Sequence, residues 1–182
     1  MSDEKVLTKE IAEQFLADED SVDLSEFTAI EDDAAESLSK REGPLWLNGL
    51  TSLSDAAAES LSKHEGTLHL NGLTSLSAAA AESLSKHKNW LFLDGLTSLS
   101  DAAAESLSKH EGTLCLGGGL TSLSDAATES LSKHGDGRLD LNGLTSLSDA
   151  AAESLSKYEG DLSIDLVELP ESAAKILRNA DA

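Results

Sequence analysis

Four histidines recur at one position of an internal repeat, and such a series raises the question of a metal site. The four are His64, His87, His110 and His134. The same position holds Arg41 in the first unit and Tyr158 in the last, and these residues do not suit a shared metal. Zinc needs ligands about 2.0–2.1 Å from the ion, whereas stacked units lie about 4.8 Å or more apart. We therefore expect no metal and no cofactor, and interpret the series as cationic or aromatic groups facing helix C-termini.

The single cysteine, Cys115, is the strongest candidate nucleophile, but it lacks a base. His69 is the nearest histidine on the same predicted face and lies two units away, about 9.6 Å by strand spacing. A nucleophile and its base must lie about 3 Å apart. The glycine-rich segments 117–119 and 135–137 lack the Lys-Ser/Thr of a phosphate-binding loop. We therefore predict that the protein is not an enzyme. A lone cysteine also excludes an intrachain disulfide framework.

A Leu-x-Leu pattern recurs along the chain at nearly constant spacing. It begins at residues 45, 68, 91, 114, 139 and 162, with the glycine-rich segments accounting for the one longer interval. A shift of 23 residues before Leu45 gives Val22-Asp23-Leu24, which we interpret as a diverged first strand. Self-similarity at this period is typical of a solenoid, in which each unit buries its apolar face against its neighbours.

The unit from 67 to 89 shows which elements the repeat predicts. Leu68-His69-Leu70 alternates as a short strand does, with both leucines pointing inward. Ser77 is a natural N-cap for a helix over 78–86. Asn89, or a glycine at the same position of other units, suits a left-handed helix cap. A strand, a helix and a parallel strand imply a right-handed crossover.

These units resemble the leucine-rich-repeat family over about residues 22–165. The residues that carry the resemblance are the Leu-x-Leu strand, a further Leu three positions on, and Leu-Ser-Asp at the start of a helix. They are most similar to the cysteine-containing subclass, although Leu50, Leu73, Leu96 and Leu144 stand where that subclass usually has Asn or Cys. The resemblance implies an α/β fold: a right-handed leucine-rich-repeat solenoid, with parallel strands on the concave face and helices on the convex face. With the usual Asn ladder absent, the Thr-Ser pairs after the strands are candidates to bond the backbone.

The two ends of the chain are predicted to cap the array within a single domain, 1–182. Residues 1–20 form an N-terminal helical cap, in which Ile11, Phe15 and Leu16 share one face. Residues 21–165 form the repeats, and 166–182 form a C-terminal cap helix beginning near Pro170. A solenoid needs such caps because its terminal units have only one neighbour, so we expect a complete domain.

The positions that vary between units are the candidates for recognition. The middle residue of each strand and the residue two before it point away from the inward leucines. These positions hold the predicted partner-binding residues Trp46, His69, Trp90, Phe92, Cys115, Arg138 and Asp140. Exposed aromatic residues rimmed by charge are typical of protein interfaces. We therefore predict a protein-interaction scaffold, with a purely structural or self-associating repeat as the alternative.

Charge narrows the classes of partner. The formal net charge is −21, from 34 acidic and 13 basic residues. So negative a surface repels phosphate backbones and anionic membranes, and we expect neither nucleic acid nor membrane as a partner. The charged N-terminus has no apolar segment typical of a signal peptide, which predicts a cytoplasmic protein.

Overall fold

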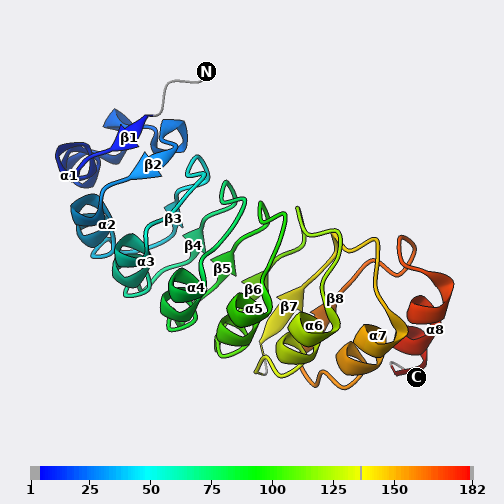
Figure 1. The fold of residues 1–182 in the computed structure, drawn as a ribbon. Helices are drawn as coiled ribbons and strands as arrows, with labels where there is room; N and C mark the ends of the chain where they lie inside the picture. The colour runs from blue at the N-terminus through cyan, green and yellow to red at the C-terminus, as the bar shows by residue number, and fades with distance from the viewer. Residues whose placement is uncertain (1–4, 136, 181–182) are drawn as a thin grey trace.

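The computed structural model describes residues 5–135 and 137–180, in which short strands and helices alternate (Figure 1). Asp136, in the second glycine-rich segment, lies outside the described residues. The strands are β1 (Val6–Leu7), β2 (Ala29–Ile30), β3 (Leu45–Trp46), β4 (Leu68–His69), β5 (Leu91–Phe92), β6 (Leu114–Cys115), β7 (Arg138–Asp140) and β8 (Asp161–Ser163). The α-helices are α1 (Lys9–Ala17), α2 (Asp32–Leu38), α3 (Asp55–Leu61), α4 (Ala78–Leu84), α5 (Asp101–Leu107), α6 (Asp125–Leu131), α7 (Asp149–Leu155) and α8 (Glu171–Ala180). None of the helices in these described ranges is long and apolar enough to cross a membrane.

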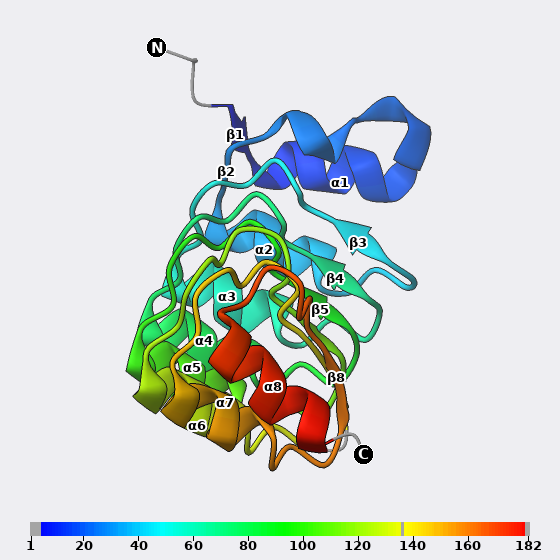
Figure 2. The same ribbon diagram turned by 90° about the vertical axis from the view of Figure 1, so that its right-hand side faces the viewer.

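Strands β3 to β8 form one parallel sheet in sequence order, which confirms an α/β solenoid of about 23 residues per unit. Leu45 pairs with Leu68 and Leu68 with Leu91, so equivalent residues lie side by side. The register continues through the longer unit, where Leu114 pairs with Leu139. The helices form a second layer on one side of the sheet (Figures 1 and 2). Each strand therefore presents its outward side chains on the surface opposite to the helices.

The core lies between the two layers and repeats with the sequence. In the 67–89 unit, Leu68, Leu70, Leu73 and Leu84 are fully buried, as are the two helix alanines Ala80 and Ala81. The small alanines let the helix approach the sheet closely, while the leucines fill the space between units. Because burial of each leucine contributes about 1.5–3 kcal/mol, the repeated pattern stabilises every unit against its neighbours.

Serine caps begin the helices as predicted, and they also join neighbouring units. The Ser77 hydroxyl oxygen accepts the Ala80 backbone N–H at 2.9 Å, and donates to the Asp55 carboxylate of the preceding unit at 2.5 Å. The same link recurs at Ser54, Ser124 and Ser148. Four aspartates in first helical turns therefore bond the cap of the next unit, in addition to their favourable place at the helix dipole: Asp32, Asp55, Asp101 and Asp125.

A ladder of side-chain oxygens follows the strands, although not at the position usual for the resembling subclass. Asn48 Oδ1 accepts the Asn71 N–H at 3.2 Å, Asn71 Oδ1 the Asp94 N–H at 3.1 Å, and Asp94 Oδ1 the Gly117 N–H at 3.0 Å. The predicted Thr bonds occur as well, since the Thr51 hydroxyl donates to Thr28 O at 3.2 Å. After β3, β4 and β5, the residue that follows the Leu-x-Leu pattern thus bonds a backbone N–H of the next unit, which the leucines cannot do.

The predicted left-handed conformation is wrong at Gly66, Asn89, Gly112 and Gly160, and occurs only at the equivalent Gly43 of the first unit. Among the described residues the only positive φ is at Gly43, at 82°. Glycine is needed at the equivalent positions for another reason: a Cβ on Gly66 would lie 2.0 Å from Gly43 O, and one on Gly112 would lie 2.4 Å from Asn89 O. Neighbouring units approach one another so closely at these loops that there is no room for a side chain.

The N-terminal cap differs from the prediction in two places. Residues 22–24 form no strand; a 3-10 turn over Leu24–Glu26 begins at Asp23, whose carboxylate accepts the Ser25 N–H at 2.9 Å. The parallel pair β1–β2 stands apart from the main sheet instead. Phe15 is buried as predicted, but Leu16 is exposed. At the other end α8 covers the last unit through Ala173, Ala174 and Leu177.

Candidate interaction surface

Four aromatic residues lie together on the outer face of strands β3 to β5, as the alternation predicted. We call Trp46, His69, Trp90 and Phe92 the aromatic stripe. The rings of Trp46 and His69 are stacked at 5.5 Å between centroids, and those of His69 and Phe92 at 4.4 Å. Trp90 lies 6.1 Å from Phe92 with its ring tilted by 51°. The parallel register places these rings side by side because the middle residue of each strand pairs with the middle residue of the next.

Stacking covers only part of the stripe. Trp46 and Trp90 are each 53% exposed, whereas His69 and Phe92 between them are half-buried. Burial lowers the pKa of His69, against a smaller opposing effect of the Asp94 charge. The imidazole is therefore held in its neutral form and acts as another flat ring in the stack. The stripe thus exposes two large apolar side chains, Trp46 and Trp90, which pack against the half-buried rings of His69 and Phe92.

The predicted polar extension of the stripe holds one buried residue. Cys115 is only 7% exposed, and its burial, together with the charges of Asp94 and Asp140, raises the pKa of its thiol to about 12. Such a thiol stays protonated and is a poor nucleophile. Cys115 is therefore a buried apolar side chain of β6, between β5 and β7. It is not the exposed polar contact that the sequence predicted.

Arg138 and Asp140 do lie on the outer face. The Arg138 guanidinium lies 3.5 Å from the Asp140 carboxylate and 3.9 Å from that of Asp161, and donates a hydrogen bond to Ser163 Oγ at 3.1 Å. These partners hold the guanidinium along the sheet. Its charge is consequently already balanced by carboxylates of the same face.

Asp94 is a further charged residue of this face, and our comparison of the repeat units did not single it out. Burial is the main cause that raises its pKa, and the nearby Asp140 charge acts in the same direction. The signal was available, since Asp94 lies two residues after Phe92 and must point the same way. It occupies the position of Asn48 and Asn71 in the oxygen ladder, where it alone brings a negative charge.

A small apolar cavity borders the stripe at Trp46. It measures about 180 Å³ and lies between the N-terminal cap and strand β3. Its lining residues are Phe15, Val22, Asp23, Leu24, Ser25, Pro44 and Trp46. The cavity occupies the place where the sequence predicted a first strand over 22–24, and no pattern within the repeats indicated it.

The repeated histidines form a buried stack on the opposite side of the core. Their rings follow one another at 6.4, 6.1 and 6.0 Å, and the series continues to Tyr158 at 6.2 Å. These spacings exceed the 5.5 and 4.4 Å between rings of successive units in the aromatic stripe, so the units fan apart toward the helices and the sheet lies on the concave side. Among the described residues no group of three or more His, Cys, Asp or Glu side chains is placed to hold a metal ion.

The histidines contact loop carbonyls of the preceding unit. His64 Nε2 lies 2.9 Å from Gly43 O, and His134 Nε2 lies 3.0 Å from Gly112 O. Burial, with the neighbouring rings, lowers the pKa of His87 to about 4. Burial also lowers the pKa of His110 and of His134. Burial thus favours the neutral form of these three histidines, which corrects the cationic form of our interpretation and supports the aromatic one.

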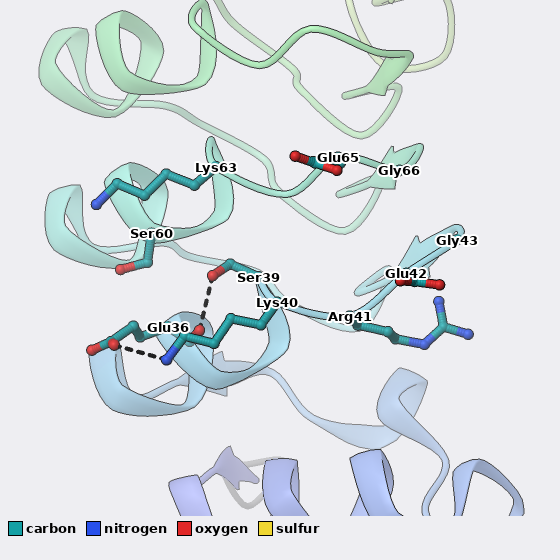
Figure 3. Close-up of a pocket in the computed structure, with 10 residues that line it drawn as sticks. All are labelled: Glu36, Ser39, Lys40, Arg41, Glu42, Gly43, Ser60, Lys63, Glu65 and Gly66. Carbon is teal, nitrogen blue, oxygen red and sulfur yellow. Dashed lines mark hydrogen bonds and ion pairs between the residues drawn. The ribbon is translucent and has the colours of Figure 1, made fainter.

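Open grooves separate successive helices near their C-terminal ends. Figure 3 shows one of them, of about 840 Å³, with Lys40 and Glu36 paired at 3.0 Å along its wall. Similar grooves follow between the next units, with the same kinds of lining residue. Because the repeat itself generates them, and because lysines and glutamates line them in alternation, these grooves present no convergent set of catalytic groups.

Comparison with known proteins adds no relative to this description. No protein-family model matches the chain, and no curated protein matches its sequence.

Proposed function

We propose that this protein is a non-enzymatic scaffold that binds a protein partner through the aromatic stripe on its concave face. The observation that carries the proposal is the placement of Trp46 and Trp90. They are the only tryptophans in the chain, and both stand half-exposed on the same face. Exposed tryptophans grouped on an ordered surface are typical of binding hot spots.

Two further observations support this proposal. The resemblance to leucine-rich repeats, which rests on the Leu-x-Leu strands and the Leu-Ser-Asp helix starts, agrees with a binding module by analogy of fold. The thiol of Cys115 is buried and has a raised pKa, and the histidine series is buried as well, so neither supplies an accessible activated nucleophile. The net charge of −21 argues against nucleic acid and membranes as partners. We also propose a cytoplasmic location.

The test is a comparison of native-lysate pull-downs with wild type and with Trp46→Ser/Trp90→Ser/Phe92→Ser. A matched control, Leu16→Ser/Val167→Ser, removes exposed apolar side chains that lie off the stripe. Circular dichroism first establishes that all three proteins fold. We expect a protein retained by the wild type and the control, and lost by the stripe variant.

Equal retention by all three proteins would contradict the proposal. The alternative is a structural repeat whose stripe pairs two copies of the chain. Light scattering at high concentration separates the two, because a self-associating stripe would give twice the mass of one chain in the wild type and a single mass in the stripe variant.

A further inference from the structure

The apolar cavity beside Trp46 lies where a strand is missing from the main sheet. Helix α2 stacks on α3, but no strand of that sheet precedes α2, so β3 is the first strand of the sheet. The chain at residues 24–26 turns away from β3 as a 3-10 turn, and meets the first unit again only at the loop after that strand. A Cβ on Gly49 would lie 2.2 Å from Ser25 O, so contact there is tight. Beside β3 itself, the missing strand leaves the cavity open against the exposed ring of Trp46.

The size of the cavity limits its occupant. At about 180 Å³ it is smaller than the roughly 300–1,000 Å³ of sites that hold whole small molecules. Its walls are formed by side chains of Phe15, Val22, Leu24, Pro44 and Trp46. Space of this volume with apolar walls fits one aliphatic or aromatic side chain. The cavity also continues directly into the stripe, because Trp46 belongs to both.

The charges on the same face indicate which other side chains a bound segment would carry. Asp23 lines the cavity, and Asp94 and Asp140 lie further along the face beyond Phe92. The one cation at the outward strand positions from β3 to β8 is Arg138, which is already paired with Asp140 and Asp161. Burial and the Asp140 charge both disfavour the ionised form of Asp94. A cation placed nearby would relieve that repulsion, and it would also be attracted to the faces of the indole rings.

We propose that the cavity takes one apolar side chain of a basic, extended protein segment, whose cationic side chains lie along the aromatic stripe toward Asp94 and Asp140. This inference rests on the proposed function, because it names the chemistry of the partner at the same surface. The apolar anchor gives the segment a fixed starting point. The carboxylates and ring faces beyond it favour Lys or Arg over acidic residues.

The experiment selects random linear peptides displayed on phage against the full chain. The binding of the selected peptides to each protein is then measured by isothermal titration calorimetry, which does not depend on the tryptophans that the stripe variant lacks. Val22→Trp fills the cavity from its own wall. Pro44→Arg adds a cation at its rim, at a position where β7 already carries arginine in Arg138. Val167→Arg is the matched control, since it adds the same charge at an exposed residue that lies off the stripe and away from the cavity lining.

We expect selected peptides with one apolar residue beside several basic ones. Val22→Trp should weaken them about 10- to 100-fold, the equivalent of losing one buried apolar side chain. Pro44→Arg should weaken them as well, with a weaker dependence on salt than the wild type shows, while Val167→Arg binds as the wild type does. Because Pro44→Arg changes an exposed residue, it remains informative if Val22→Trp does not fold.

Three other outcomes would overturn the inference and can be told apart. Peptides that lose binding in the stripe variant but bind Val22→Trp and Pro44→Arg normally would reject the cavity and the basic segment while retaining the proposed function. Selection of no peptide, or of peptides that bind the stripe variant unchanged, would reject both. Selection of acidic peptides would reject the basic partner.

Discussion

Replacing His87 with phenylalanine is expected to remove part of the acid sensitivity of this fold. His87 is buried in the histidine stack, and neither ring nitrogen makes a hydrogen bond of normal geometry. Its pKa is lowered from 6.5 to about 4, mainly by burial. The unfolded chain therefore binds a proton near pH 6.5 that the folded chain resists. The stability due to the neutral ring is complete above pH 6.5 and is lost as the pH falls toward 4.

The size of the effect follows from the lowered pKa. Each pKa unit corresponds to about 1.4 kcal/mol, so the full shift is worth about 3 kcal/mol. Roughly 2.5 kcal/mol of this is lost by about pH 4.5, because the unfolded histidine is then fully protonated and the folded one largely neutral. Phenylalanine keeps a flat ring between His64 and His110 and does not titrate. His87→Phe should therefore match the wild type near pH 7 and lose about 2.5 kcal/mol less on acidification.

Urea unfolding followed by circular dichroism at a series of pH values measures this difference. An m-value of about 2 kcal/mol per molar urea converts it into a midpoint change of about 1 M at the acid end. His69→Phe is the matched control: it makes the same substitution in a half-buried ring, and a smaller change is expected. Equal pH dependence of the unfolding free energy in His87→Phe and the wild type would refute the reasoning.

Three further predictions concern single positions of the repeat. Ala78→Asp should supply the carboxylate that the Ser100 hydroxyl lacks in the preceding unit, and should raise the free energy of unfolding by about 0.5–1.5 kcal/mol; an unchanged urea midpoint would contradict the cap-to-cap link. Gly66→Ala should destabilise the fold by several kcal/mol, at least about 2, because its Cβ would collide with a backbone carbonyl of the preceding unit. Gly135→Ala is the control, since nothing lies within 4 Å of its Cβ, and similar melting temperatures for the two variants would contradict this explanation. Cys115 should react with iodoacetamide at pH 8 only at the rate of unfolding, because its thiol is buried and protonated; rapid modification of the native protein would show that the thiol is accessible.

The repeat alone was sufficient to predict the architecture and the aromatic stripe. A period of 23 residues places Leu68, Leu91 and Leu114 in register, because each unit can bury its leucines only against the equivalent residues of its neighbours. Strand alternation then directs His69 and Phe92 to the outer face. Both conclusions depend on local geometry that every copy shares, and the structure confirms them.

Other features depend on how neighbouring units meet, which no single unit encodes. The glycines after the helices are required by the close approach of the next loop, and a local rule for helix caps therefore gave the wrong reason for them. The thiol of Cys115 is buried because the neighbouring strands and their side chains surround it. The sequence determined which residues repeat and which way they point, since period and alternation are properties of the chain. The depth of burial, the lowered pKa of His87 and the cavity left by the missing strand at 22–24 were decided by tertiary packing, because they depend on contacts between units and with the N-terminal cap.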